Sequence, residues 1–170
     1  MSVAVTDTGK ESGAADDAVP EQTSWPTTPS ARHKARRFAL QALYTWQIGG
    51  EPPHAIEAYY RAENDMRKTD VIYFHELFRA VVAQPDALDG SFAAFLDRPV
   101  RDLDPIERAI LRIAAFELAH RVDIPPRVAI NEGIELAKEF GATDDSHKYV
   151  NGVLDKLARK LRTAEFAGRI

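Results

Sequence analysis

The sequence contains no cysteine, so it can form neither a disulfide framework nor a thiolate metal site. No apolar run approaches the roughly 20 residues that a membrane-spanning helix requires. The N-terminus also lacks the apolar segment of a secretory signal. Together these absences favour a soluble protein of the reducing cytoplasm with no membrane partner.

Signatures of the common catalytic sites are missing as well. The chain has no GxxxxGK[ST] phosphate loop, no GxGxxG fingerprint, no GxSxG and no HExxH motif. Its five histidines are scattered, and no two of them have the i,i+4 spacing of a helical metal site. We therefore expect no enzymatic activity, no metal and no cofactor.

Charge is distributed unevenly along the chain. Residues 1–30 hold five acidic residues and one lysine, so the whole formal net charge of −4 resides in this segment. The segment is rich in small, polar and proline residues and has a single aromatic residue, Trp25. Too little apolar surface is available to offset the entropy of ordering, which predicts a disordered acidic tail over residues 1–30.

The rest of the sequence has helical periodicity. Apolar residues recur at spacings of three and four, and no long segment alternates with period two. This pattern predicts an all-α fold of about seven helices in two bundles. The expected cap signals are Gly49-Gly50, Asp70, Asp104-Pro105 and Ser146, and Pro85 is expected to close the helix that begins at Asp70. The expected units are an N-terminal helical subdomain over 31–98, a linker over 99–104 and a C-terminal helical subdomain over 105–165.

The first predicted helix, "ARHKARRFALQALYTW" over residues 31–46, starts with four fixed cations. A helix N-terminus carries the positive end of the macrodipole, so each misplaced cation costs about 0.3–1 kcal/mol. Neutralised phosphates would offset that cost, and Gln and Tyr on the same face could contact bases. The competing interpretation is a solvated face whose tyrosine packs into the core. The face comprises His33, Arg37, Gln41, Tyr44 and Ile48, with Lys34 beside it.

A second candidate is the segment "ATDDSHKYVNG". Ser146 is expected to cap a helix that presents Lys148 and Tyr149 away from its apolar stripe, and the free N–H groups of its first turn could receive a phosphate. On these residues alone, an ordinary helix cap is the better interpretation.

Three segments together resemble the NusB family of bacterial transcription antitermination factors. They are "ARRFALQALYTWQ", "LDPIERAILRIAAFEL" and "VAINEGIELAKEFGATDDSHKYVNGVLDKLA", and the resemblance covers about residues 31–162. Phe116 and Tyr149 stand where the family pattern has Tyr and Phe, respectively. The acidic tail is not part of that pattern.

The resemblance implies two perpendicular three-helix subdomains packed around a common core, and a role without catalysis. It implies pairing with NusE, a small-subunit ribosomal protein, on single-stranded boxA RNA of ribosomal RNA transcripts, within a complex of other Nus factors and RNA polymerase. It also implies that Glu107 faces the partner. The implied RNA-binding residues are Arg32, Lys34, Arg36, Arg37, Gln41 and Tyr44 on the first helix, with Lys148 and Tyr149 beside it.

Three expectations follow for variants and for the tail. Arg36→Glu or Arg37→Glu should weaken RNA binding without unfolding the chain, and Tyr44→Asp should do the same if its ring stacks on a base. The tail, whose charge balances that of the cationic cluster, should screen that cluster from RNA.

Two other functions remain open from the sequence. Helical domains of this kind also precede ribosomal RNA cytosine methyltransferases, although such an enzyme needs an α/β cofactor domain and a nucleophilic cysteine, and this sequence contains no cysteine. A purely protein-binding helical module with an incidental basic face is the other alternative.

Overall fold

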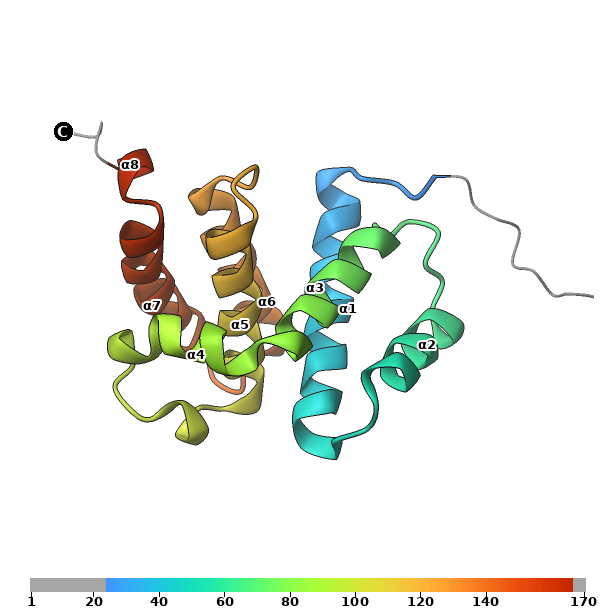
Figure 1. Ribbon diagram of the computed structural model, residues 1–170, viewed down its shortest axis with the longest axis horizontal. Coiled ribbons are helices and arrows are strands. Elements are labelled where there is room, and N and C mark those ends of the chain that lie inside the picture. Colours follow the sequence, from blue (N-terminus) through green and yellow to red (C-terminus); the bar gives the residue numbers. More distant parts are fainter. Residues whose placement is uncertain (1–23, 167–170) are drawn as a thin grey trace, which may run out of the picture.

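The computed structural model describes residues 24–166, and all regular structure within them is helical. The all-α prediction is therefore confirmed (Figure 1). None of the helices in this range is long and apolar enough to cross a membrane. In chain order the elements are α1 (Pro29–Gly49), α2 (Pro53–Glu63), α3 (Val71–Ala83), α4 (Pro85–Phe92), the 3₁₀ turns η1 (Ala93–Phe95) and η2 (Val100–Asp102), α5 (Pro105–His120), α6 (Pro126–Phe140), α7 (Ser146–Leu161) and the short α8 (Thr163–Phe166).

Most of the predicted helix ends are confirmed. Gly50 adopts the left-handed conformation, with φ of 67°, and donates its N–H to Trp46 O at the end of α1. The side chains of Asp70 and Asp104 accept hydrogen bonds from backbone N–H groups in the first turns of α3 and α5. Each of these local signals acts through its own helix end, which is why the sequence alone reveals it.

One further predicted boundary is confirmed and one is wrong. α3 ends at Ala83, just before Pro85, as predicted, and Pro85 also occupies the first position of α4, where its missing N–H costs no hydrogen bond. Ser146 does not cap α7, because Asp145 holds the cap position and Ser146 is already helical and buried. Ser146 instead packs against Gly141, where a β-carbon would lie only 2.7 Å from the Ser146 side chain.

The helices form two groups that share one hydrophobic core. α1, α2 and α3 pack together on one side of the molecule, and α5, α6 and α7 on the other (Figure 1). α4 packs on α5 and α7 and also contacts α3, and the division at the linker 99–104 stays a prediction from the sequence. α5 lies between the two groups, and its residues 109–118 are all buried.

The first helix begins earlier than the sequence suggests. α1 starts at Pro29, where Thr28 Oγ1 accepts a hydrogen bond from Ala31 N–H, and Trp25 packs against the core. The remainder of the predicted tail, residues 1–23, lies outside the described residues.

Candidate nucleic-acid interface

Arg36, in the middle of the cationic cluster, is buried, with only 2% of its surface exposed. Its guanidinium donates to both carboxylate oxygens of Glu117 on α5, from Nε at 3.1 Å and from Nη2 at 2.7 Å. The hydroxyl of Tyr73 on α3 donates to the same carboxylate. A charge-assisted, bidentate pair of this kind joins three helices inside the molecule.

Arg36 therefore does not belong to an RNA-binding surface, and that prediction is wrong. The expectation that Arg36→Glu would weaken RNA binding without unfolding the chain is equally wrong, because it would place a second carboxylate beside buried Glu117. Periodicity already carried the signal, since Arg36 precedes Leu40 and Leu43 by four and seven residues on the stripe that faces the core.

Three other basic side chains of α1 also have acidic partners. Arg32 Nε lies 3.6 Å from Asp70, and the Arg32 guanidinium stacks over Tyr73, 5.1 Å from the ring centroid. His33 Nδ1 lies 2.6 Å from Glu132 on α6. Arg37 Nε donates to Glu139, also on α6, at 3.1 Å, and its guanidinium lies over the ring of Phe140.

These intramolecular partners explain why cations are tolerated at the start of α1. Their charges offset the unfavourable macrodipole without any nucleic acid, so that the dipole argument no longer favours RNA over a solvated face. Lys34 is different: it is partly exposed and has no ion pair or hydrogen bond within residues 24–166. Arg32 and Arg37 also keep part of their guanidinium surface open to solvent.

The face beyond these cations carries Gln41, Tyr44 and Ile48. Tyr44 is 39% exposed and Ile48 is 58% exposed, so the tyrosine is not packed into the core. Gln41 donates from Nε2 to Arg37 O, which leaves its side-chain oxygen available as an acceptor. The expected combination of cation, amide and aromatic ring on one face of α1 is thus present, without Arg36.

The side chains of the second candidate segment make their contacts away from α1. Lys148 is 74% exposed and lies 3.6 Å from Asp145 in its own turn. The Tyr149 hydroxyl donates to Asp97 Oδ1 at 2.9 Å, and the guanidinium of Arg98 lies 5.4 Å from its ring centroid. No hydrogen bond or ion pair within residues 24–166 joins either side chain to α1. Burial is the largest cause that raises the pKa of Tyr149. The backbone N–H of Asp97 and the charge of Arg98 oppose this rise, and the carboxylate of Asp97 adds to it.

Glu107, the predicted partner-facing residue, lies near this second segment. Burial and the carboxylate of Asp104 raise the pKa of Glu107, and Arg98 and Asp97 are close enough to affect it too. Asp97 and Arg98, which precede the predicted linker, therefore influence both Glu107 and Tyr149.

The acidic residues that organise the basic helix were missed from the sequence. Glu132 and Glu139 lie two turns apart on α6, and Glu117 lies on α5, roughly 80 to 100 residues from the cations they meet. Their one visible signal is the spacing of seven, which places Glu132 and Glu139 on the same helix face. Only the packing of α1 on α5 and α6 assigns them to these partners.

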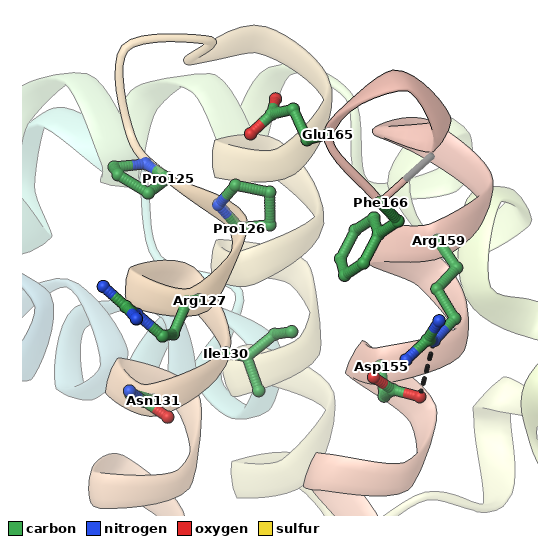
Figure 2. Close-up of a pocket in the computed structure, with 9 residues that line it drawn as sticks. All are labelled: Pro125, Pro126, Arg127, Ile130, Asn131, Asp155, Arg159, Glu165 and Phe166. Atoms are coloured by element: carbon green, nitrogen blue, oxygen red, sulfur yellow. Dashed lines mark hydrogen bonds and ion pairs between the residues drawn. The ribbon is translucent and has the colours of Figure 1, made fainter. Parts of the chain in front are cut away.

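Another concavity contains none of the predicted site residues. Figure 2 shows this groove between α6 and α7, with Pro126, Ile130 and Phe166 along it and Arg127 and Arg159 at its rim. Its volume is about 400 Å³, and Arg159 donates to Asp155 at 3.1 Å within it. Among residues 24–166, no group of three or more His, Asp or Glu side chains could hold a metal ion.

Sequence comparison identifies a family that covers most of the chain. The sequence model of the NusB family matches residues 33–159. The transcription antitermination protein NusB of Alcanivorax borkumensis is 58% identical over 144 residues, which cover 85% of this chain and 95% of that protein. The protein of the same name from Teredinibacter turnerae is 54% identical over 82% of this chain and 95% of its own length.

The fold is also similar to those of solved NusB structures. NusB of T. maritima is 28% identical and superposes with a TM-score of 0.66, covering 79% of this chain and 94% of that one. A crystal structure of the antitermination factors NusB and NusE in complex with dsRNA contains a chain that is 25% identical. Its TM-score is also 0.66, and the match covers 78% of this chain and 99% of that one.

Proposed function

Because this chain belongs to the NusB family, we propose that it is a transcription antitermination factor without catalytic activity. It binds single-stranded boxA-type RNA of ribosomal RNA transcripts together with NusE, and acts with other Nus factors on RNA polymerase. The observation that carries this proposal is the relationship to antitermination proteins, which covers 95% of each of the two relatives and 82% to 85% of this chain. The solved complex of NusB, NusE and RNA supports the choice of partners.

On this chain, the RNA surface is the exposed side of α1. Lys34 and the open parts of Arg32 and Arg37 contact phosphates, while Gln41 and Tyr44 contact unpaired bases. Lys148 and Tyr149 form a second contact region, next to Glu107 on the partner-facing side. Two separate regions fit a complex in which the partner completes the binding surface between them.

The test is a titration of labelled boxA RNA, with and without NusE, at two salt concentrations. We expect NusE to strengthen binding and salt to weaken it steeply. The affinity for boxA RNA should also exceed that for a scrambled RNA. A duplex of the same sequence serves as the competitor that separates single-strand from double-strand recognition. If boxA and scrambled RNA bind alike under every condition, the chain is a protein-binding helical module instead.

Tyr44 provides the sharpest single variant. Tyr44→Ala should weaken boxA binding by about tenfold, the loss expected for one stacked base, and leave the melting temperature nearly unchanged because the ring is 39% exposed. Arg61→Gln, an exposed position on α2 outside the proposed RNA contact regions, is the control for a surface change. A melting temperature that falls as much as in a core truncation would show that the ring packs instead of binding RNA.

A further inference from the structure

A groove of about 450 Å³ runs between η1 and the outer face of α7. Phe95 and Tyr149 contribute aromatic rings to it, and Lys148 and Lys156 contribute cations. Lys148, Gly152, Lys156 and Lys160 follow one another at intervals of four, so they share one face of α7. The side chain of Lys160 ends 5.8 Å from the Phe95 ring centroid.

The electrostatics of this groove favour an anion. Lys156 and Lys160 are exposed and have no ion pair within residues 24–166. The carboxylate in the groove, Asp97, is already engaged by Arg98 at 2.7 and 3.0 Å and by the Tyr149 hydroxyl at 2.9 Å. Its charge is balanced locally, so the uncompensated charge of the groove is positive.

Gly152 lies in the groove between the two lysine positions. Its backbone is helical, and a β-carbon built on it would meet no atom within 4 Å. Glycine destabilises a helix interior relative to alanine, and no packing contact requires it at this position. What it does provide is a helix backbone that a bound chain can approach closely.

We infer that this groove holds a stretch of single-stranded RNA that continues from the contact region at Lys148 and Tyr149. Phosphates meet Lys156 and Lys160, the strand passes over Gly152, and a base stacks on the ring of Phe95. Continuity with Lys148 and Tyr149, together with the aromatic rings between regularly spaced cations, favours RNA over an acidic peptide. The inference rests on the proposed function and adds a third contact region to it.

The test compares two labelled RNAs in the presence of NusE: the boxA segment, and the same segment extended by six uridines at either end. For the full-length chain, we expect one of the two extensions to tighten binding by about tenfold. Lys156→Gln with Lys160→Gln should abolish that gain and lower the salt dependence for the extended RNA by about 0.7 per lysine. Arg61→Gln, also an exposed cation on a helix, should leave the gain intact.

Gly152→Ala separates binding from folding, because the two readouts should move in opposite directions. The alanine should raise the melting temperature while reducing the gain from the extension severalfold. Gly90→Ala on α4, where a β-carbon also meets nothing, should raise the melting temperature without affecting RNA.

The outcomes distinguish the inference from the proposed function. If the chain binds boxA RNA but neither extension tightens binding, or if the lysine variants keep the gain, the groove does not hold RNA and only this inference fails. The same holds if the lysine variants weaken NusE binding in the absence of RNA, which would assign the groove to a protein. If the chain discriminates no boxA RNA at all, the proposed function and the inference fail together.

Discussion

At the scale of single residues, Arg36 shows how one side chain can resemble a binding residue and serve the core. Arg36 and Glu117 are both buried, with side-chain exposures of 3% and 1%. Removing one member of a buried ion pair leaves the other charge without compensation, which typically costs about 3–5 kcal/mol. Burial and the Glu117 contacts thus make Arg36 a link between α1 and α5.

Arg36→Gln should therefore lower the free energy of unfolding by about 3–5 kcal/mol, measured by urea denaturation. Arg37→Gln is the matched control, because its partner Glu139 is as exposed as Arg37 itself, and its cost should stay below about 1 kcal/mol. Equal losses in the two variants would mean that burial does not set the strength of the Arg36 pair.

Tyr73 gives the pH counterpart of the same cluster. Burial, and next the negative charge of Glu117, raise the pKa of Tyr73 well above its ordinary value. The phenol stays protonated in the folded chain at pH values where an unfolded tyrosine, with a pKa of about 10, ionises. Its contribution to stability is complete below that unfolded pKa and is lost as the pH rises above it.

Tyr73→Phe should therefore be less stable than the parent at pH 8, because Glu117 loses a hydrogen-bond donor. The difference between the two melting temperatures should shrink between about pH 10 and pH 11.5, as the unfolded parent ionises. If the difference between the two melting temperatures stays constant across that range, the pKa of Tyr73 is not raised in the folded chain.

At the scale of helices, Arg162, which follows α7, stabilises the end of α5 through hydrogen bonds. Its guanidinium donates to four backbone carbonyls at the end of α5 and in the turn that follows: Glu117 O at 3.2 Å, Leu118 O at 2.6 Å, Arg121 O at 2.8 Å and Ile124 O at 3.2 Å. The last carbonyls of a helix lack intrahelical donors, so a side chain that follows α7 completes α5.

Arg162→Ala should lower the free energy of unfolding by at least about 3 kcal/mol, since several buried acceptors lose a charged donor together. Arg162→Lys should recover only part of this, because an ammonium cannot reproduce the planar array of five donors. Arg159→Ala, which removes an exposed i,i+4 partner of Asp155, is the control and should cost below about 1 kcal/mol. Thermal and urea unfolding of the three variants measure these losses. A loss for Arg162→Ala no larger than that for Arg159→Ala would show that the Arg162 contacts do not stabilise α5.

The helices themselves could be predicted because their signals are local. Asp70, Asp104 and Gly50 act on their own helix ends, and the apolar spacing fixes the buried faces. Contacts between distant helices could not be predicted in this way. A β-carbon on Gly133 would lie 2.7 Å from Leu154 Cδ1 on α7, so that side chain would have to shift, and only the packing of α6 on α7 reveals this contact.

In the candidate site, too, the features set by one helix could be predicted and those set by contacts between helices could not. The face with Gln41 and Tyr44 follows from the periodicity of one helix, and the structure retains it. The separation of cations into buried, paired and unpaired ones depends on acidic residues of α3, α5 and α6 that no local pattern connects to α1. That separation is why Arg36 was assigned wrongly, whereas Lys34, which is partly exposed, stays a predicted RNA contact.

At the scale of the whole molecule, charge is divided between an acidic N-terminal segment and the cationic surfaces. Several cations of α1 are already paired with acidic residues of the folded part, so only a few uncompensated charges attract RNA. The acidic residues of 1–23 lie outside the described residues, and screening by them stays a prediction from the sequence. Because so few cations are uncompensated, even a modest competing negative charge should change the affinity for RNA.

Deletion of residues 1–23 should therefore tighten boxA binding at low salt. The deletion should stop there, since Trp25 packs against the core and Thr28 supports the start of α1. The gain should fade as salt rises, because the Debye length shortens from about 30 Å at 0.01 M to about 8 Å at 0.15 M. A chain of full length in which the acidic residues of this segment are replaced by Asn and Gln should behave like the deletion. Unchanged dissociation constants in both variants would show that the segment does not compete with RNA, and tightening in the deletion alone would indicate steric exclusion instead of charge.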